Sequence, residues 1–322
     1  MNANKKRENV RMAQEILQVT PLPTFMMQML QQGDYVVHDH THIKDPGALS
    51  KVTAVVGTGA SKVDKKLLMM LPNVKLIAIC GVGYDGVDMD AAKEKNIVVT
   101  HTPGVLTDDV ADLAFGLVLS IGRRIPHADR FVRNGDWVDD AFMLTHKVSG
   151  ARLGLVGMGR IGRAIAKRAS AFDMQIAYAS RAPKADLSYR FYDNVTALAA
   201  AVDYLVVAVP GGDDTHHLID TEVLTALGQK GYLINIARGS VVDQPALVQA
   251  LKDKEIAGAA LDVFWDEPIV DPELRRLANV VLTPHIASAT VETRYAMAAL
   301  TMQNLQAFYA KAVLPSPVPE CQ

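Results

Sequence analysis

The sequence predicts an α/β protein built from doubly wound parallel sheets, and three observations support this fold class. Short apolar runs typical of buried strands alternate with helical patterns along most of the 322 residues. A glycine-rich turn at 157–162 joins one of these strands directly to a helix. The chain is also long enough to form two domains with separate hydrophobic cores.

The first third of the chain has its own set of strand patterns, with helical patterns such as 63–71 between several of them. The strand patterns are 16–19, 35–38, 54–56, 76–79 and 97–100. This alternation is typical of a parallel sheet, and the segment has no nucleotide-binding fingerprint. We therefore expect a flavodoxin-like domain that binds the substrate.

The segment 151–181 predicts a strand, a tight turn, a helix and a second strand. Its turn fits the pattern G-x-G-x-x-G in the strand–turn–helix context that a dinucleotide-binding site requires. Gly157 would permit the tight turn, Gly159 the approach of a pyrophosphate, and Gly162 close packing of helix and strand. The start of the helix would offer N–H groups to the phosphates. An ordinary tight turn is the alternative interpretation.

The end of the second strand, 176–179, indicates which dinucleotide is bound. NAD-binding turns usually end this strand with a carboxylate that holds the adenosine ribose, whereas here Ser180-Arg181 and then Lys184 follow. A hydroxyl and two cations would hold a 2′-phosphate, which a carboxylate would repel. We therefore expect NADP(H) to be preferred and NAD(H) to be usable. The alternative is that Arg181 and Lys184 are solvated loop charges.

A long helix is predicted over 110–121, just before the fingerprint unit. Thr107 or Asp108 is expected to cap it, and Asp109 lies in its first turn, where an acidic side chain is favourable.

Four further strand patterns follow the fingerprint unit, at 204–209, 232–236, 257–261 and 280–283. With the two strands of that unit they predict a six-stranded sheet. The last helical pattern, 291–312, is expected to return to the first domain. The chain would then consist of a substrate-binding domain, 1–101 plus 288–322, and a Rossmann-like dinucleotide-binding domain, 102–287, with an active-site cleft between them.

Arg238, Glu267 and His285 each follow one of the last three strand patterns, where ligands bind in such sheets. A guanidinium can bind both the carboxylate and the ketone of a 2-oxoacid. A histidine can protonate the carbonyl oxygen, and a neighbouring carboxylate favours the imidazolium. Each residue also has a structural interpretation, as a surface charge, a loop residue before a proline and a hydrogen-bonded structural histidine, respectively.

The composition argues against several other classes of protein and of site. A net charge of −2 gives no sign of a surface for nucleic acid, no apolar run approaches the ~18 residues of a membrane span, and no metal-ligand cluster is apparent. Only two cysteines occur, Cys80 and Cys321, which fits a reducing compartment. The polar start of the chain lacks a secretory signal and is expected to be a loose tail. Together these features predict a cytoplasmic protein.

Six segments in order resemble the D-isomer-specific 2-hydroxyacid dehydrogenases, over about 52–318. They are CGVGYDGVD at 80–88, HTPGVLTDDVADLA at 101–114, VGMGRIG at 156–162, NIARGSVVD at 235–243, LDVFWDEP at 261–268 and TPHIASAT at 283–290. The resemblance implies that Arg238, Glu267 and His285 are the catalytic set. It also implies that the backbone N–H groups of Val82 and Gly83 bind the substrate carboxylate.

The resemblance further implies a second substrate loop at Gly57-Thr58 and an acceptor for the nicotinamide carboxamide at Asp262. Ala287 stands where the family commonly has Gly, and its methyl group is expected to crowd the carboxamide without abolishing binding. The residues expected to contact the cofactor are Thr107, Gly157, Met158, Gly159, Arg160, Ile161, Gly162, Ser180, Arg181, Lys184, Val209, Pro210, Thr215, Ile236, Ala237, Asp262 and Ala287.

Within the family, Ser180-Arg181 is similar to the NADPH-preferring glyoxylate and hydroxypyruvate reductases, which include enzymes acting on 2-ketogluconate. This similarity implies a homodimeric, NADPH-dependent reductase of a small 2-oxoacid. The segment RNGDWV at 133–138 implies that Trp137 reaches the partner subunit's active site, with packing in a dimer interface as the alternative. Two other functions stay open: an NAD-linked dehydrogenase of a larger 2-hydroxyacid, and a dinucleotide-sensing binding protein on the same fold.

Overall fold

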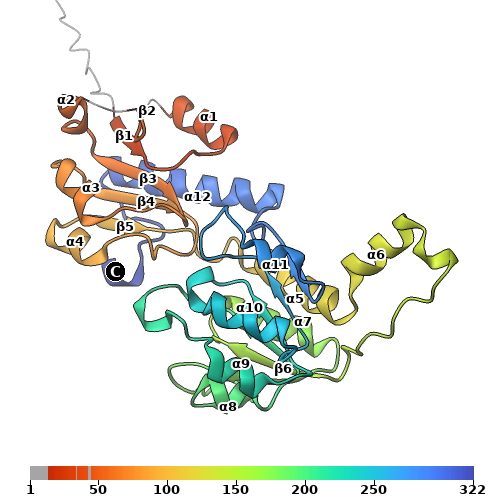
Figure 1. Cartoon of the computed structure of the whole chain (residues 1–322). Helices are drawn as coiled ribbons and strands as arrows, with labels where there is room; N and C mark the ends of the chain where they lie inside the picture. Colours follow the sequence, from red (N-terminus) through yellow and green to blue (C-terminus); the bar gives the residue numbers. More distant parts are fainter. Residues whose placement is uncertain (1–13, 34, 43–44) are drawn as a thin grey trace, which may run out of the picture. The chain divides into compact units, whose positions relative to one another are not determined.

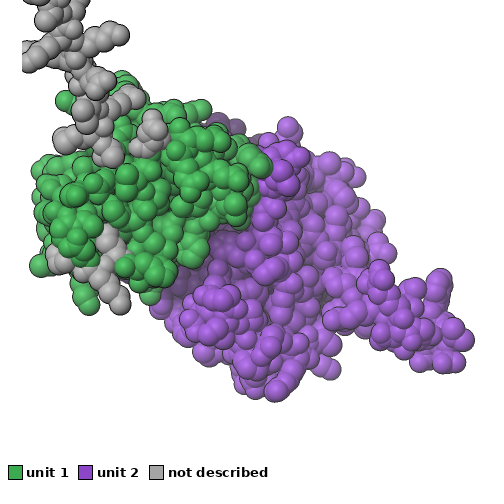
Figure 2. All heavy atoms as spheres, turned by 90° about the horizontal axis from the view of Figure 1, so that it is seen from above, with its two compact units in different colours: residues 1–103, 294–322 green, residues 104–293 purple. Residues whose placement is uncertain are grey.

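The computed structural model describes residues 14–33, 35–42 and 45–322. The tail expected at the start of the chain therefore lies outside the described residues. The chain divides into two compact units, shown in different colours in Figure 2. Unit 1 comprises residues 1–103 and 294–322, and unit 2 comprises residues 104–293.

In the described part of unit 1, five parallel strands form one sheet in the order β2-β1-β3-β4-β5. The strands are β1 (Gln14–Gln18), β2 (Tyr35–Asp39), β3 (Ala54–Thr58), β4 (Leu76–Cys80) and β5 (Val98–Thr100). The helices are α1 (Thr24–Gln32), α2 (Pro46–Leu49), α3 (Lys65–Met70), α4 (Met89–Glu94) and all but the first three residues of α12 (Val291–Tyr309), with a short 3₁₀ helix, η4 (Pro319–Cys321).

Two helices of unit 1, α3 and α4, begin where short polar side chains cap them, and their apolar side chains pack in one cluster with the sheet. Asp64 and Asp88 accept hydrogen bonds from backbone N–H groups in the first turns of α3 and α4. Leu68 of α3 and Ile77 of β4 belong to one fully buried apolar cluster. Because β3 and β4 are adjacent and parallel, the residues that follow both strands lie at the same edge of the sheet.

Unit 2, all of whose residues are described, contains a parallel sheet of seven strands in the order β12-β11-β10-β9-β6-β7-β8. The strands are β6 (Arg152–Val156), β7 (Gln175–Ala179), β8 (Arg190–Tyr192), β9 (Tyr204–Val207), β10 (Tyr232–Asn235), β11 (Gly258–Leu261) and β12 (Val280–Leu282). The helices are α5 (Thr107–Gly122), α6 (Ile125–Asn134), α7 (Arg160–Ser170), α8 (Val195–Ala199), α9 (Thr221–Leu227), α10 (Gln244–Lys252) and α11 (Pro272–Arg276), with the 3₁₀ helices η1 (Asp136–Val138), η2 (Asp213–Thr215) and η3 (Gly239–Val241).

The α/β class with two parallel sheets is confirmed, but the prediction of six strands in the second sheet was wrong. The additional strand, β8, pairs with β7 at the edge of the sheet. Arg190 is exposed and the two aromatic residues after it are only half-buried. No apolar run marks this strand, because an edge strand of three residues buries little side-chain surface.

The sheet of unit 2 reverses its winding between β6 and β9. The chain proceeds from β6 to β7 and β8 on one side, and then from β9 to β12 on the other. Val156 and Val207, at the carboxyl ends of β6 and β9, are directly paired. Ligands of doubly wound sheets bind beyond the carboxyl ends of the strands at such a switch point, and the glycine turn that follows β6 lies there.

The expected cap of α5 was also wrong. The helix begins at Thr107, its N-cap residue is Leu106, and no side chain caps it. Asp108 and Asp109 lie in the first turn, as does Thr107, but both carboxylates have other partners. Asp108 pairs with Arg168 at 3.3 Å, and Asp109 accepts a short hydrogen bond from the hydroxyl of Thr290.

The segment from α6 to residue 147 extends away from the body of unit 2 (Figure 1). No residue of α6 is buried. Among the helices of the described residues, none combines the length and apolarity that a bilayer span requires.

Candidate active site

The glycine turn after β6 is shaped by steric requirements at two of its glycines. Gly157 has a φ of +99°, and a Cβ there would lie 2.5 Å from the backbone oxygen of Ala208. A Cβ at Gly162 would collide with the backbone oxygen of Gly157. Both positions therefore require glycine, and together they bring the start of α7 close to β6 and β9.

Gly159 faces open space instead. It is the N-cap residue of α7, no side chain caps that helix, and no atom lies within 4 Å of the place where its Cβ would be. The N–H groups at the start of α7, in Arg160 and Ile161, therefore border a cradle that a Cβ would fill. A helix N-terminus with free N–H groups binds anions, so the residues present fit the pyrophosphate of a dinucleotide.

The segment after β7 carries Ser180, Arg181 and Lys184, and two contacts fix it. The backbone N–H of Lys184 donates a hydrogen bond of 2.7 Å to the hydroxyl of Tyr178, which is buried in β7. Arg163 of α7 forms a bidentate ion pair with Asp186, at 2.6 and 3.1 Å.

The ion pair with Arg163 lowers the pKa of Asp186. This carboxylate therefore stays ionised, and the guanidinium of Arg163 balances its charge. Arg181 itself is exposed, and the hydroxyl of Ser180 donates to the backbone oxygen of Ala182. The guanidinium of Arg181 therefore lies between the end of β7 at Ala179 and a segment fixed by the contacts of Lys184 and Asp186.

His285 and Glu267 form a short polar contact at the carboxyl edge of this sheet. His285 Nδ1 lies 2.6 Å from Glu267 Oε2, and Glu267 Oε1 accepts a hydrogen bond of 2.9 Å from the backbone N–H of Phe264. An ionised carboxylate can only accept hydrogen bonds, so Nδ1 carries the hydrogen. The other ring nitrogen, Nε2, is the one left for exchanging a proton with a ligand.

The environment of Glu267 favours its charged form. Burial alone would raise the pKa of this carboxyl group. The hydrogen bonds from His285 and from the N–H of Phe264 outweigh that effect, helped by the positive charges of His285 and Arg238, and the pKa of Glu267 lies below its usual value. Glu267 is thus an anion throughout the pH range in which an imidazole titrates.

Arg238 lies in the turn after β10, next to the loop that carries Glu267. Its Nη1 donates a hydrogen bond of 2.8 Å to the backbone oxygen of Ala237, and the side chain is half-buried. The following residue, Gly239, meets the backbone of Phe264 so closely that a Cβ would collide with it. This backbone approach brings the turn of Arg238 and the loop of Glu267 together.

His285 has a left-handed backbone, with a φ of +52°, which is costly for a residue with a side chain. Its N–H donates to the backbone oxygen of Asp262 at 2.8 Å. The fully buried carboxylate of Asp262 accepts hydrogen bonds from the Thr283 hydroxyl and from the N–H groups of Ile286 and Ala287. These contacts hold the segment that carries the imidazole.

Asp262 is thus a positioning residue within unit 2, a role that the sequence did not reveal. Its two oxygens have three donors among the described residues, and a carboxylate can accept about four hydrogen bonds. The carboxylate therefore retains capacity for one further donor, such as an amide of a cofactor.

The other residues expected to line the cofactor site follow β9 and β10. The hydroxyl of Thr215 donates to the backbone oxygen of Pro210 at 2.7 Å, which closes the loop after Val209 into a compact turn. Ile236 and Ala237 are buried directly after β10.

The substrate loops expected from the sequence lie in unit 1. Gly57 and Thr58 end β3, whereas Val82 and Gly83 follow β4, and the two adjacent strands bring these four residues to one sheet edge. The hydroxyl of Ser61 accepts a hydrogen bond of 2.7 Å from the N–H of Thr58, which fixes the first loop.

Trp137 lies in η1 of the extended segment, and 68% of its surface is exposed. Trp137 thus belongs to the extended segment, whereas Arg238, Glu267 and His285 follow β10, β11 and β12.

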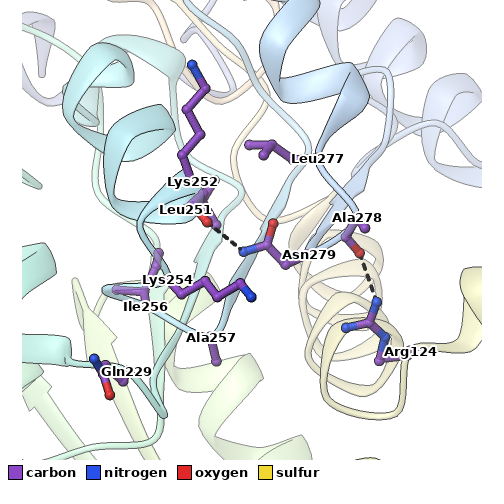
Figure 3. Close-up of a pocket in the computed structure, with 10 residues that line it drawn as sticks. All are labelled: Arg124, Gln229, Leu251, Lys252, Lys254, Ile256, Ala257, Leu277, Ala278 and Asn279. Carbon is purple, nitrogen blue, oxygen red and sulfur yellow. Dashed lines mark hydrogen bonds between the residues drawn. The ribbon is translucent and has the colours of Figure 1, made fainter. Parts of the chain in front are cut away.

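A cavity of about 460 Å³ lies elsewhere in unit 2 and is not part of this site (Figure 3). It is lined by residues that precede β10, β11 and β12, such as Gln229, Ala257 and Asn279. Because the strands are parallel, this cavity lies at the amino edge of the sheet, opposite to the edge of His285. Hydrogen bonds from Asn279 to Leu251 and from Arg124 to Ala278 tie its walls together.

Comparison with known proteins bears on the chemistry of this arrangement. Residues 115–287 match the family model described as D-isomer specific 2-hydroxyacid dehydrogenase, NAD binding domain. This match covers more than half of the chain. The chain belongs to the D-isomer specific 2-hydroxyacid dehydrogenase family. It is accordingly an NAD(P)-dependent oxidoreductase.

Two reductases are similar to this chain along most of its length. The chain is 49% identical over 269 residues to a glyoxylate/hydroxypyruvate reductase A of Arabidopsis thaliana, covering 84% of this chain and 86% of that protein. It is 45% identical over 307 residues to a hydroxyphenylpyruvate reductase of Plectranthus scutellarioides, covering 94% of this chain and 98% of that protein.

A solved structure also resembles this dehydrogenase fold along nearly its whole length. It is the NADPH-dependent glyoxylate/hydroxypyruvate reductase of Sinorhizobium meliloti in complex with NADP and malonate, with a TM-score of 0.90 and 40% identity. The match covers 96% of this chain and 98% of that chain.

Proposed function

We propose that this dehydrogenase uses NADPH to reduce a small 2-oxoacid, of the glyoxylate or hydroxypyruvate type, to the D-2-hydroxyacid. 2-Ketogluconate belongs to the same chemical class. The observation that carries the proposal is the hydrogen bond of 2.6 Å between His285 Nδ1 and Glu267 Oε2, beside the turn of Arg238. The names of the relatives described above support the substrate class.

In this proposal, three side chains act on the substrate. The guanidinium of Arg238 binds the carboxylate and the ketone oxygen, and it stabilises the negative charge that develops on that oxygen. His285 donates the proton from Nε2 to the same oxygen, which becomes the hydroxyl of the product. Glu267 stabilises the imidazolium before the transfer and orients the ring. Bound NADPH supplies the hydride that the carbonyl carbon receives.

The preference for NADPH follows from the segment after β7. Arg181 and Lys184 would pair with a 2′-phosphate, and Ser180 would add a hydroxyl. No carboxylate stands at the end of β7, where an NAD-binding turn holds the ribose hydroxyls. We expect NADH to be accepted less efficiently, because it offers no charge to these cations.

The assay that tests this function measures NADPH and NADH oxidation with a panel of 2-oxoacids. Glyoxylate and hydroxypyruvate with NADPH should give the highest kcat/KM. His285→Ala should reduce kcat by about 10²- to 10⁴-fold, the usual contribution of a general acid, and NADPH binding should persist. Binding of NADPH without turnover of any 2-oxoacid would favour a dinucleotide sensor instead.

A larger, aromatic 2-oxoacid is the second candidate substrate, favoured by the relative named hydroxyphenylpyruvate reductase. The same panel distinguishes the two candidates. A higher kcat/KM for hydroxyphenylpyruvate than for hydroxypyruvate would support the aromatic substrate.

We also propose a homodimer in which Trp137 reaches the active site of the partner subunit. The extended segment presents several large apolar side chains to solvent, including Val138 and Leu144 at 88% and 96% exposure. Exposed apolar groups gathered on one segment indicate a protein interface. Cys80 and Cys321 are both free thiols, which supports our proposal of a reducing, cytoplasmic location.

A further inference from the structure

The loop after β4 is fixed by a side chain that the proposed chemistry does not use. His101 Nδ1 lies 2.9 Å from the backbone oxygen of Val82. A carbonyl oxygen can only accept a hydrogen bond, so Nδ1 carries the hydrogen and His101 is the donor. Both residues belong to unit 1.

The oxygen of Val82 and the N–H of Gly83 belong to the same peptide unit. A peptide unit is planar and its C=O and N–H bonds point in opposite directions in the trans form. A donor that fixes the direction of the C=O therefore fixes the direction of the N–H as well. A hydrogen bond to the oxygen also polarises the peptide, which makes its N–H a stronger donor.

His101 is itself held in place by the C-terminal part of unit 1. Its backbone N–H donates to the oxygen of Ser316, and its backbone oxygen accepts from the Ser316 hydroxyl at 2.6 Å. Ser316 is buried and exchanges hydrogen bonds with Asn304 of α12 in both directions. Hydrogen bonds to both the N–H and the oxygen of His101 therefore hold the backbone that carries the imidazole.

The ring of His101 is also packed on one side. The ring of Tyr84 meets it edge to face, with centroids 5.4 Å apart. The Tyr84 hydroxyl donates to the carboxylate of Glu320, at 3.0 and 3.2 Å. Burial, together with this hydrogen bond to Glu320, raises the pKa of Tyr84 to about 12, so the hydroxyl stays a neutral donor at physiological pH.

We propose that His101 is a positioning residue for the carboxylate of the substrate: it aims and polarises the N–H of Gly83 through the oxygen of Val82. This inference rests on the proposed function, and on the expectation from the sequence that the N–H groups of Val82 and Gly83 bind the substrate carboxylate together with Arg238. His101 does not touch the substrate in this arrangement. It acts on ground-state binding, whereas His285 acts on proton transfer.

The test compares two substitutions of the same shape, His101→Asn and His101→Leu. The Nδ2 of asparagine is as many bonds from Cα as the Nδ1 of histidine, so asparagine can donate to Val82. Leucine has nearly the same shape as asparagine but no donor. The measurements are KM and kcat for glyoxylate, the inhibition constant of oxalate, and the Kd of NADPH.

His101→Leu should raise the KM for glyoxylate and the inhibition constant of oxalate by about 3- to 10-fold, the value of one neutral hydrogen bond. The Kd of NADPH should stay within twofold of wild type. His101→Asn should restore both substrate constants to within about twofold of wild type, and its kcat should be nearly unchanged.

Equal effects of His101→Leu and His101→Asn on the KM for glyoxylate would overturn the proposal, whether both are large or both negligible. A purely structural role predicts equal losses, accompanied by a lower Tm in both variants. Failure of the proposed function is a separate result, because the wild-type enzyme would then show no turnover of any 2-oxoacid.

Discussion

His285 Nδ1 and Glu267 Oε2 lie 2.6 Å apart, and the two residues come from different loops of unit 2. His285 follows β12 with a left-handed φ of +52°, held by hydrogen bonds to Asp262 and its backbone. Glu267 lies in the loop after β11, where it accepts from the N–H of Phe264. Hydrogen bonds to backbone groups of unit 2 thus anchor both ends of the contact.

The first prediction concerns the pH dependence of reduction. Glu267 stays anionic at neutral pH because its pKa lies below the usual value, and this anion favours the imidazolium of His285. Glu267→Gln removes the negative charge beside the ring, so activity should be lost at a lower pH. Because reduction needs the protonated ring, the alkaline limb of the kcat/KM profile should move to lower pH.

The measurement is kcat/KM against pH for wild type and Glu267→Gln. Glu273→Gln, at an exposed carboxylate paired with Lys252, is the matched control and should leave the profile unchanged. Superimposable profiles for Glu267→Gln and wild type would show that Glu267 is not the partner of the catalytic ring.

The second prediction concerns Arg238. A guanidinium that binds both the substrate carboxylate and the developing oxyanion contributes to ground-state and transition-state binding. Arg238→Ala should therefore raise the KM for glyoxylate and lower kcat together. Arg238→Lys keeps the charge but loses the two-pronged geometry, so it should recover only part of the loss. Full activity of Arg238→Lys would argue against bidentate binding.

The third prediction concerns cofactor choice. Arg181→Ala should lower kcat/KM for NADPH by about 10- to 150-fold, corresponding to ~1.5–3 kcal/mol for a hydrogen bond to a charged group. The value for NADH should change little, since NADH has no 2′-phosphate. Lys230→Ala, at an exposed cation before β10, is the control for loss of positive charge. Equal losses with both cofactors would exclude a role of Arg181 in binding the phosphate.

The fourth prediction concerns the extended segment. If Trp137 closes one side of the partner's pocket, Trp137→Ala should raise the KM for hydroxypyruvate and relax the selectivity against phenylpyruvate. The dimer should persist, because the many other exposed apolar groups of the segment remain. Sedimentation and the two KM values test this together: a wild-type monomer at micromolar concentration, or unchanged selectivity in the variant, would contradict the arrangement.

The sequence predicted most of the fold because buried parallel strands leave continuous apolar runs. Strand β8 was not predicted, because Arg190 is exposed and the strand has only three residues. The cap of α5 was mispredicted because Asp108 and Asp109 had partners far along the chain, Arg168 and Thr290, that no local pattern contains.

The candidate site could likewise be predicted only where it did not depend on contacts between residues far apart in the sequence. Arg238, Glu267 and His285 could be predicted because they follow β10, β11 and β12, and ligands of such sheets bind beyond the carboxyl ends of the strands. The supporting contacts of Asp262 and His101 depend on tertiary hydrogen bonds to backbone groups, which spacing along the chain does not encode.

The most direct test of the account is the reaction of wild-type enzyme with NADPH and hydroxypyruvate, followed by chiral analysis of the product. The account predicts that one D-glycerate forms for each NADPH oxidised, with a higher kcat/KM than with NADH. Formation of L-glycerate, or NADPH binding without any product, would contradict it.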